Sequence, residues 1–199
     1  MKLIVATQNK GKLREIRRIL QDVDIEICGM DEYPHVIAAI EDGTTFAENA
    51  QKKAEAVVRQ TGEMCLADDS GLSVACLGGR PGVYSARFAG ENASDADNNA
   101  LLLREMTNIP AQERQAAFCC VMALCSADGS CRLFEGRLEG EIMFSAVGDG
   151  GFGYDPLFRL TDDSRSLAQI SLDEKNTISH RGIALRQVVA VLQRCKDVK

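Results

Sequence analysis

Apolar and polar positions follow two different periods along this chain, and each period marks one kind of element. Short apolar runs, or polar and apolar residues in strict alternation, predict β-strands. The longest apolar run is apolar on both faces, which is typical of a central strand. Strands are expected at Lys2–Ala6, Asp24–Cys28, Met64–Ala67, Arg114–Ala127 and Ser130–Leu138, the last two joined by a hairpin turn at Asp128-Gly129.

Helical spacing of apolar residues separates these strands. Helices are expected from about Lys12, from Thr45 to about Gln60, from Ser94 to about Met106, and from about Ser179 onward. The second and third open with the capping patterns Thr45-x-x-Glu48 and Ser94-x-x-Asp97. The last carries one apolar face of Ala184, Leu185, Val188, Leu192 and Cys195. Because helices and strands alternate around one hairpin, we predict an α/β fold with a mixed sheet.

Glycine, proline and polar residues mark the expected loops. We expect loops over residues 29–44, 78–90 and 148–156, and a tight turn at Asp68-Asp69-Ser70-Gly71. The chain has no internal repeat, low-complexity tract or linker. We therefore expect residues 1–199 to form one domain.

Composition then narrows the function classes. Hydrophobic residues make up 45% of the chain and charged residues 26%, which excludes collagen-like, disordered and coiled-coil proteins. The net charge of −6 argues against a nucleic-acid partner, because phosphate neutralisation needs an excess of Lys and Arg. No run approaches the ~20 apolar residues of a membrane span. The apolar run Leu3–Ala6 is shorter than the core of a signal peptide, so we expect a cytoplasmic protein.

The cysteines do not form a metal motif. Eight are present, without any Cys-x-x-Cys pair, and the chain has two histidines. A zinc site is therefore not expected. Cys119, Cys120 and Cys125 lie in the long apolar run and are expected to be small buried hydrophobes, and no disulfide framework is expected without secretion.

A polar turn after the first strand is the first candidate site. Thr7, Asn9 and Lys12 stand between the strand and the helix that follows it. The unpaired N–H groups of a helix N-terminus attract phosphate, and these side chains add donors and a positive charge. The alternative is an ordinary turn, since no Walker A loop is present.

Adjacent carboxylates at the end of a strand are the second. Asp68 and Asp69 should point in different directions, so that one can bind a cation while the scaffold holds the other. Magnesium prefers oxygen ligands and usually brings substrate phosphates with it, and Glu41 in the preceding loop offers a further ligand. The alternative is a turn made of good turn residues.

One helix face and one glycine-rich loop carry further candidates. Asn49 and Lys53 lie one turn apart on the second helix, where a surface ion pair between Glu48 and Lys52 is the plainer interpretation. The loop 148–156 contains G-x-G-x-x-G, but Pro156 stands where a dinucleotide-binding helix would begin. Phe152 or Tyr154 could instead stack on a planar base, or both could be core aromatics.

Lys175, His180 and Arg181 form the last candidate group. They are expected close to the start of the final helix, where all three can donate to oxygen atoms. Arginine can bind a carbonyl or phosphate with two parallel hydrogen bonds. The presence of His180 beside Arg181 and near Lys175 is poorly explained by a purely structural role in packing.

Together these segments resemble the inosine triphosphate pyrophosphatase family, the non-canonical purine NTP pyrophosphatases. The matching runs occur in the family's order and cover nearly the whole chain: ATQNKGKLREI, FAENAQKKA, ADDSGL, GGRPGVYSARFAG, GGFGYDPLF and EKNTISHRGIAL. The resemblance implies an elongated mixed sheet flanked by helices, with two lobes and a central active-site cleft. It also implies a cytoplasmic homodimer that uses Mg²⁺ to hydrolyse XTP, ITP and dITP to the monophosphate and pyrophosphate.

The resemblance also implies a role for each matching residue. Asp69 is implied as the proton acceptor, with Glu41 and Asp69 as metal ligands. The triphosphate would bind to the turn of Thr7, Gln8, Asn9, Lys10, Gly11 and Lys12, and to Lys53 and Ser70. The base would meet Phe152, Gly153, Tyr154 and Asp155, and be recognised by Lys175, His180 and Arg181.

Three rival functions remain open on the sequence. A pyrophosphatase for pyrimidine or modified nucleotides would share the fold, although the 175–181 motif argues against it. A purine-nucleotide sensor would not need a carboxylate that activates water. An RNA-binding module would use the basic helix after Lys10, against the acidic net charge.

Overall fold

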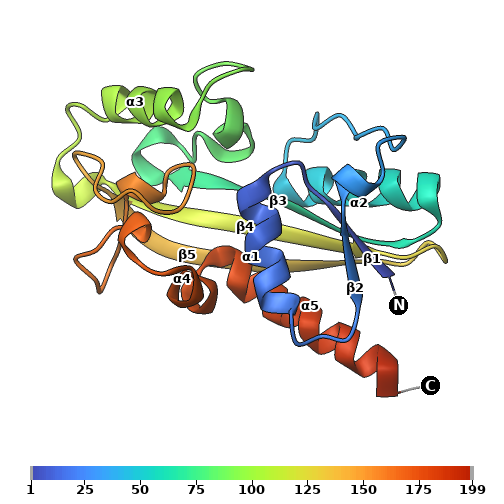
Figure 1. The fold of residues 1–199 in the computed structure, drawn as a ribbon. Coiled ribbons are helices and arrows are strands. Elements are labelled where there is room, and N and C mark those ends of the chain that lie inside the picture. The colour runs from blue at the N-terminus through green and yellow to red at the C-terminus, as the bar shows by residue number, and fades with distance from the viewer. Residues whose placement is uncertain (1, 198–199) are drawn as a thin grey trace. The chain divides into compact units, whose positions relative to one another are not determined.

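A mixed six-stranded β-sheet forms the centre of the computed structural model (Figure 1), which describes residues 2–197 and the side chains of residues 2–194. The strand order is β2-β1-β3-β4-β5-β6. β1 is parallel to both β2 and β3, whereas β5 and β6 are antiparallel. The strands are β1 (Lys2–Ala6), β2 (Glu26–Gly29), β3 (Met64–Val74), β4 (Gln115–Cys125), β5 (Cys131–Ile142) and β6 (Phe158–Leu160). The predicted α/β class with a mixed sheet is confirmed.

The α-helices begin at the polar residues that the sequence offers as caps. They are α1 (Lys10–Leu20), α2 (Phe46–Thr61), α3 (Asp95–Glu105), α4 (Leu172–Ile178) and α5 (His180–Asp197). Asn9 caps α1, and Thr45 with Glu48 forms the predicted capping box of α2. Lys52 pairs with Asp42 at 2.7 Å, so the expected surface pair between Glu48 and Lys52 is not what the structure shows.

Contacts between residues divide the chain into two compact units. Unit 1 comprises residues 1–69, 120–136 and 181–199, and unit 2 comprises residues 70–119 and 137–180. The boundaries fall inside β3, β4 and β5, so these strands contribute residues to both units.

Unit 1 has two apolar cores, one on each face of its strands. Side chains alternate across a strand, and β1 places Leu3 and Val5 in one core but Ile4 and Ala6 in the other. The first core includes residues of α1 and α5, and the second includes residues of α2. β4 contributes to both cores, as expected of a strand that is apolar on both faces.

Unit 2 packs around a separate core. Its buried side chains come mainly from β3, α3, β4, the end of β5 and the segment 154–167, and include Leu72, Leu102, Phe118 and Phe158. The glycine-rich loop lies next to α3, as the orange and green ribbons of Figure 1 show.

Two sequence predictions about elements need correction. Asp68-Asp69-Ser70-Gly71 is not a turn, because β3 continues through it to Val74. Lys175 does not lie at the start of the last helix, because a separate helix, α4, ends at Ile178 before α5 begins at His180. Hydrogen bonding to the sheet and to neighbouring loops overrides the local turn propensity in the first case.

The cysteines follow the prediction only in part. Cys120 is a buried free thiol and Cys119 is half-buried. Cys125 is buried but forms a disulfide with Cys131, which the sequence analysis did not predict. The side chain of Cys195 lies outside the described residues.

Candidate functional site

The turn between β1 and α1 has the form expected of an anion-binding segment. Asn9 Oδ1 accepts a hydrogen bond from Lys12 N at 3.0 Å, and Thr7 Oγ1 accepts one from Asn9 N at 3.2 Å. Gln8, Asn9 and Lys10 are exposed, while Gly11 and Lys12 are half-buried in the first turn of the helix. The first N–H groups of α1 therefore lie beside an exposed polar turn.

Asp68 is the carboxylate that the scaffold holds. Its side chain is buried and contacts Lys12 Nζ, Arg181 Nε at 3.1 Å and Cys120 Sγ at 3.3 Å. Burial alone would raise the pKa of Asp68, but the positive charges of Arg181, Lys12 and Lys53 outweigh it and hold the pKa well below its usual value. Asp68 is therefore ionised at neutral pH and keeps Lys12 at the start of α1.

Asp69 has different partners from its neighbour, as the sequence predicted for two adjacent carboxylates. Asp69 Oδ1 accepts a hydrogen bond from Lys53 Nζ at 3.1 Å, and Oδ2 accepts one from Asn49 Nδ2 at 3.2 Å. Burial raises the pKa of Asp69, and the nearby negative charge of Glu41 adds to the rise. A carboxylate with a raised pKa is better suited to accept a proton.

Lys53 lies where two carboxylates converge. Its Nζ is 3.3 Å from Glu41 Oε1 and 3.1 Å from Asp69 Oδ1, and it donates to Asp68 O at 2.6 Å. Burial alone would lower the pKa of Lys53, but the negative charges of Asp69, Glu41 and Asp68 outweigh burial and raise the pKa above its usual value. The ammonium group therefore stays protonated.

This arrangement fits a divalent cation. Glu41 and Asp69 both direct oxygen atoms at one ammonium group, which shows that the pair can surround a positive charge. Within residues 2–194, no three His, Cys, Asp or Glu side chains group as a metal cage. Two carboxylates without a full cage can serve a divalent cation when substrate phosphates supply further oxygen ligands.

Phe152 and Lys175 form the second candidate group, in unit 2. Lys175 Nζ lies 4.6 Å from the centre of the Phe152 ring and forms a buried ion pair with Asp155. Asp155 Oδ2 also accepts a hydrogen bond from Phe152 N at 2.9 Å. The carboxylate of Asp155 therefore links the ammonium to the backbone of the aromatic residue.

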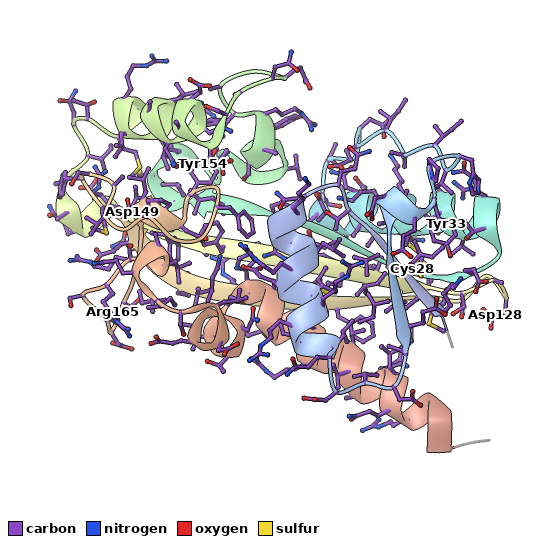
Figure 2. The ribbon with its side chains drawn as sticks, viewed as in Figure 1. Cys28, Tyr33, Asp128, Asp149, Tyr154 and Arg165 are labelled. Carbon is purple, nitrogen blue, oxygen red and sulfur yellow. A yellow bond between two sulfur atoms is a disulfide. The ribbon has the colours of Figure 1, made fainter. Side chains whose placement is uncertain are left out.

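Tyr154 belongs to the core, which corrects its proposed role in stacking. Its ring is buried among the apolar side chains of unit 2, and its hydroxyl donates to Ser85 O at 2.9 Å. Figure 2 labels Tyr154 next to α3. Of the two aromatic candidates in this loop, Phe152 is half-buried, whereas Tyr154 is buried and anchors the loop to the core.

His180 and Arg181 are neighbours in sequence but belong to different units. The His180 imidazole stacks on the Phe118 ring, with centroids 4.9 Å apart and planes inclined by 10°. Arg181 is 1% exposed and donates to the carboxylates of Asp68 and Glu15. These contacts support a positioning role for Arg181 through Asp68 rather than the expected recognition of a base.

Two features of the site escaped the sequence analysis. Glu15 is a buried acid on the inner side of α1, and only its position among the apolar residues Leu13 and Ile16 could have indicated burial. Asp95 and Asn99 of α3 bind the glycine-rich loop. Their spacing of four residues can be read in the sequence, but their partner, Gly153, cannot.

Ser70, a predicted site residue, is half-buried in β3, one residue beyond Asp69.

Comparison with known proteins gives one consistent result. The model of the Ham1 family matches residues 3–191. A dITP/XTP pyrophosphatase of Geobacter sulfurreducens is 52% identical over 184 residues, which cover 92% of each chain. One of Desulforamulus reducens is 46% identical over 194 residues, covering 98% of this chain and 96% of the relative.

Solved structures agree with the sequence relatives. A HAM1 protein from Coxiella burnetii superposes with a TM-score of 0.89 at 40% identity. That match covers 98% of this chain and 99% of the other.

Proposed function

The chain belongs to the Ham1 family, and from that premise we propose that it is a nucleoside triphosphate pyrophosphatase. Its proposed substrates are XTP, ITP and dITP, and its products are the nucleoside monophosphate and pyrophosphate. Such an enzyme removes non-canonical purines from the nucleotide pool. The names of the relatives support this substrate class.

The observation that carries the proposal is the environment of Asp69. Its carboxylate has a pKa raised by burial, lies close to a second carboxylate at Glu41 and is oriented by Asn49 and Lys53. Hydrolysis needs a group that accepts a proton from water, whereas binding alone does not. This arrangement favours hydrolysis over the sensor function.

We propose that Glu41 and Asp69 hold a magnesium ion. When bound, the ion would supply positive charge that offsets the charge of the triphosphate. The proposal is supported by the two carboxylates that converge on the Lys53 ammonium.

The reaction is the attack of water on the α-phosphorus, with pyrophosphate as the leaving group. In this proposal Asp69 accepts the proton of the attacking water, a role that typically contributes ~10²–10⁴-fold in rate. Lys12, Lys53, Ser70 and the N–H groups of the turn from Thr7 through Gln8, Asn9, Lys10 and Gly11 hold the phosphate oxygens. Their fixed dipoles and charges stabilise the transition state, which is usually the largest catalytic contribution.

Base selection is assigned to the groups of unit 2. Phe152 would stack on the purine, a contact worth ~1–3 kcal/mol by analogy with single-strand binders. ITP and XTP carry an oxygen at position 6, whereas ATP carries an amino group. A donor such as Lys175 or His180 facing that position forms a hydrogen bond to the oxygen of ITP or XTP. The amino group of ATP leaves the same donor unpaired, so the site discriminates strongly against ATP. Asp155 holds Phe152 and Lys175 in place, and Gly153 continues the loop beyond Phe152.

The proposed setting is a cytoplasmic homodimer that acts on small nucleotides, without a nucleic-acid or membrane partner. The acidic net charge supports the exclusion of nucleic acid. Among residues 2–197, no helix has the length and apolar character that crossing a membrane requires.

The test is pyrophosphate release from ITP, XTP, dITP, GTP, ATP and a pyrimidine triphosphate, each with Mg²⁺ and with EDTA. We expect release from the first three with Mg²⁺ and none with EDTA. Release mainly from the pyrimidine triphosphate would contradict the roles of Lys175 and His180. Tight binding of ITP without any release would contradict hydrolysis and favour a sensor.

A further inference from the structure

Both backbone polar groups of Gly153 are held by one helix. Gly153 N donates to Asp95 Oδ2 at 2.6 Å, and Gly153 O accepts from Asn99 Nδ2 at 3.0 Å. Asp95 and Asn99 are four residues apart, so they lie on the same face of α3. Two side chains of α3 therefore hold the two peptide groups on either side of the Gly153 Cα, an arrangement that we call the clamp.

The clamped residue adjoins the proposed stacking residue. Gly153 follows Phe152 directly and has a φ of 60°, a left-handed conformation that favours glycine. On its other side, Tyr154 is fixed by burial and by the hydrogen bond to Ser85 O. Asp155 fixes Phe152 N. The clamp on Gly153 therefore adds to Asp155 a second support for the backbone at Phe152.

The helix that carries the clamp is itself fixed within unit 2. Asn98 accepts from Ala89 N at 2.8 Å and donates to Ala86 O at 3.1 Å. Leu102 and Met106, at and just beyond its C-terminal end, are fully buried in the core. The clamp is therefore built on a supported element, as a precise binding site requires.

We propose that Asp95 and Asn99 are positioning residues that set the place of Phe152 and so determine how well the enzyme binds and selects the base. The inference rests on the proposed function and extends it to two residues that touch neither phosphate nor metal groups in that proposal. Removing either side chain leaves Gly153 with only one of its two hydrogen bonds to α3. The Phe152 ring then samples positions that fit the base less well.

Asp97 provides a matched control on the same turn. It accepts hydrogen bonds from Ser94 N at 2.9 Å and Ser94 Oγ at 2.6 Å, both within the start of α3. Asp97→Ala therefore weakens the beginning of the helix without removing a contact to Gly153. Any effect that arises only from helix stability should appear equally in this variant.

The experiment compares Asn99→Ala, Asp95→Ala and Asp97→Ala in steady-state hydrolysis of ITP and ATP. For the first two we expect KM for ITP to rise roughly tenfold, because a displaced Phe152 ring loses part of its stacking contact with the base. We expect kcat to change by less than about twofold, and the preference for ITP over ATP in kcat/KM to narrow. Asp95→Asn keeps an acceptor for Gly153 N and should restore most of the ITP preference.

Each remaining result has a definite meaning. An unchanged KM and preference in both alanine variants, in an enzyme that hydrolyses ITP, would overturn the clamp and leave the proposed function intact. An equal loss in Asp97→Ala would overturn it too, since helix stability would then explain the effect. If Asn99→Ala fails to fold, the exposed position of Asp95 provides the decisive variant. A wild-type enzyme inactive on ITP would contradict the proposed function itself.

Discussion

Adjacent aspartates acquire opposite properties in this protein. Successive side chains of a strand point to opposite faces, and Asp68 and Asp69 therefore meet different neighbours in β3. Arg181, Lys12 and Lys53 lower the pKa of Asp68 against its burial, whereas burial raises the pKa of Asp69. The first is suited to hold positive charge in place, and the second to accept a proton.

Asp69→Asn should keep the fold and lose most of kcat. The amide cannot accept the proton of the attacking water, and general-base contributions are typically ~10²–10⁴-fold. The measurement is kcat for ITP beside the midpoint of thermal unfolding, with Asp162→Asn as an exposed control. Turnover near that of the wild type would remove Asp69 from the proposed role.

Arg181→Ala should act first on stability. The guanidinium is 1% exposed and its removal leaves the buried carboxylates of Asp68 and Glu15 without this partner. Breaking a buried ion pair from one side costs about 3–5 kcal/mol. Unfolding in urea measures the loss, and the exposed Arg14→Ala in α1 serves as control. A stable Arg181→Ala variant with an altered base preference would instead restore the hypothesis that Arg181 recognises the base.

Helices, strands and loops hold the candidate site through contacts at the places where the pairing of β-strands ends. β1 pairs with β3 only as far as Ala67. Further along β3, Leu72 N donates to Ser85 Oγ at 2.8 Å, and the same hydroxyl donates to Gly82 O at 2.6 Å. A Cβ at Gly71 would lie 2.3 Å from Ser85 Oγ, so glycine serves here to let Ser85 approach rather than to form the predicted turn.

Ser85→Ala should destabilise unit 2. Its loss leaves Leu72 N and Gly82 O without the hydroxyl that now joins them, and an unsatisfied buried group costs about 1–3 kcal/mol. The free energy of unfolding by urea provides the measurement, and the half-buried Ser73→Ala on the same strand is the control. Equal stability of the two variants would show that the hydroxyl does not hold this part of β3.

Across the molecule, strands of one sheet carry candidate site residues in each of the two units. Asp68 and Asp69 lie at the last positions of β3 in unit 1, and Phe118 of β4 supports His180 in unit 2. The remaining groups come from the segments that enter and leave the sheet: the turn before α1, the helix α2, the glycine-rich loop and α4. Each unit has its own apolar core, which keeps its set of groups in place.

The class of fold, the family and the segments that carry the candidate site could all be predicted from the sequence. These features depend on local periodicity, capping patterns such as Thr45-x-x-Glu48, and short motifs in a fixed order, all of which can be read along the chain. The α/β class with a mixed sheet and the resemblance to the pyrophosphatase family are both confirmed.

The surroundings of each ionisable group could not be predicted in this way, because they depend on contacts between distant parts of the chain. Arg181 meets Asp68 across 113 residues and Glu15 across 166, and α3 meets Gly153 across more than 50. Contacts at such separations shift the pKa of Asp68, bury Arg181 between two carboxylates and place Tyr154 in the core. The spacing of apolar and polar residues along the chain contains no information on these contacts. They arise from packing between elements that are distant in sequence.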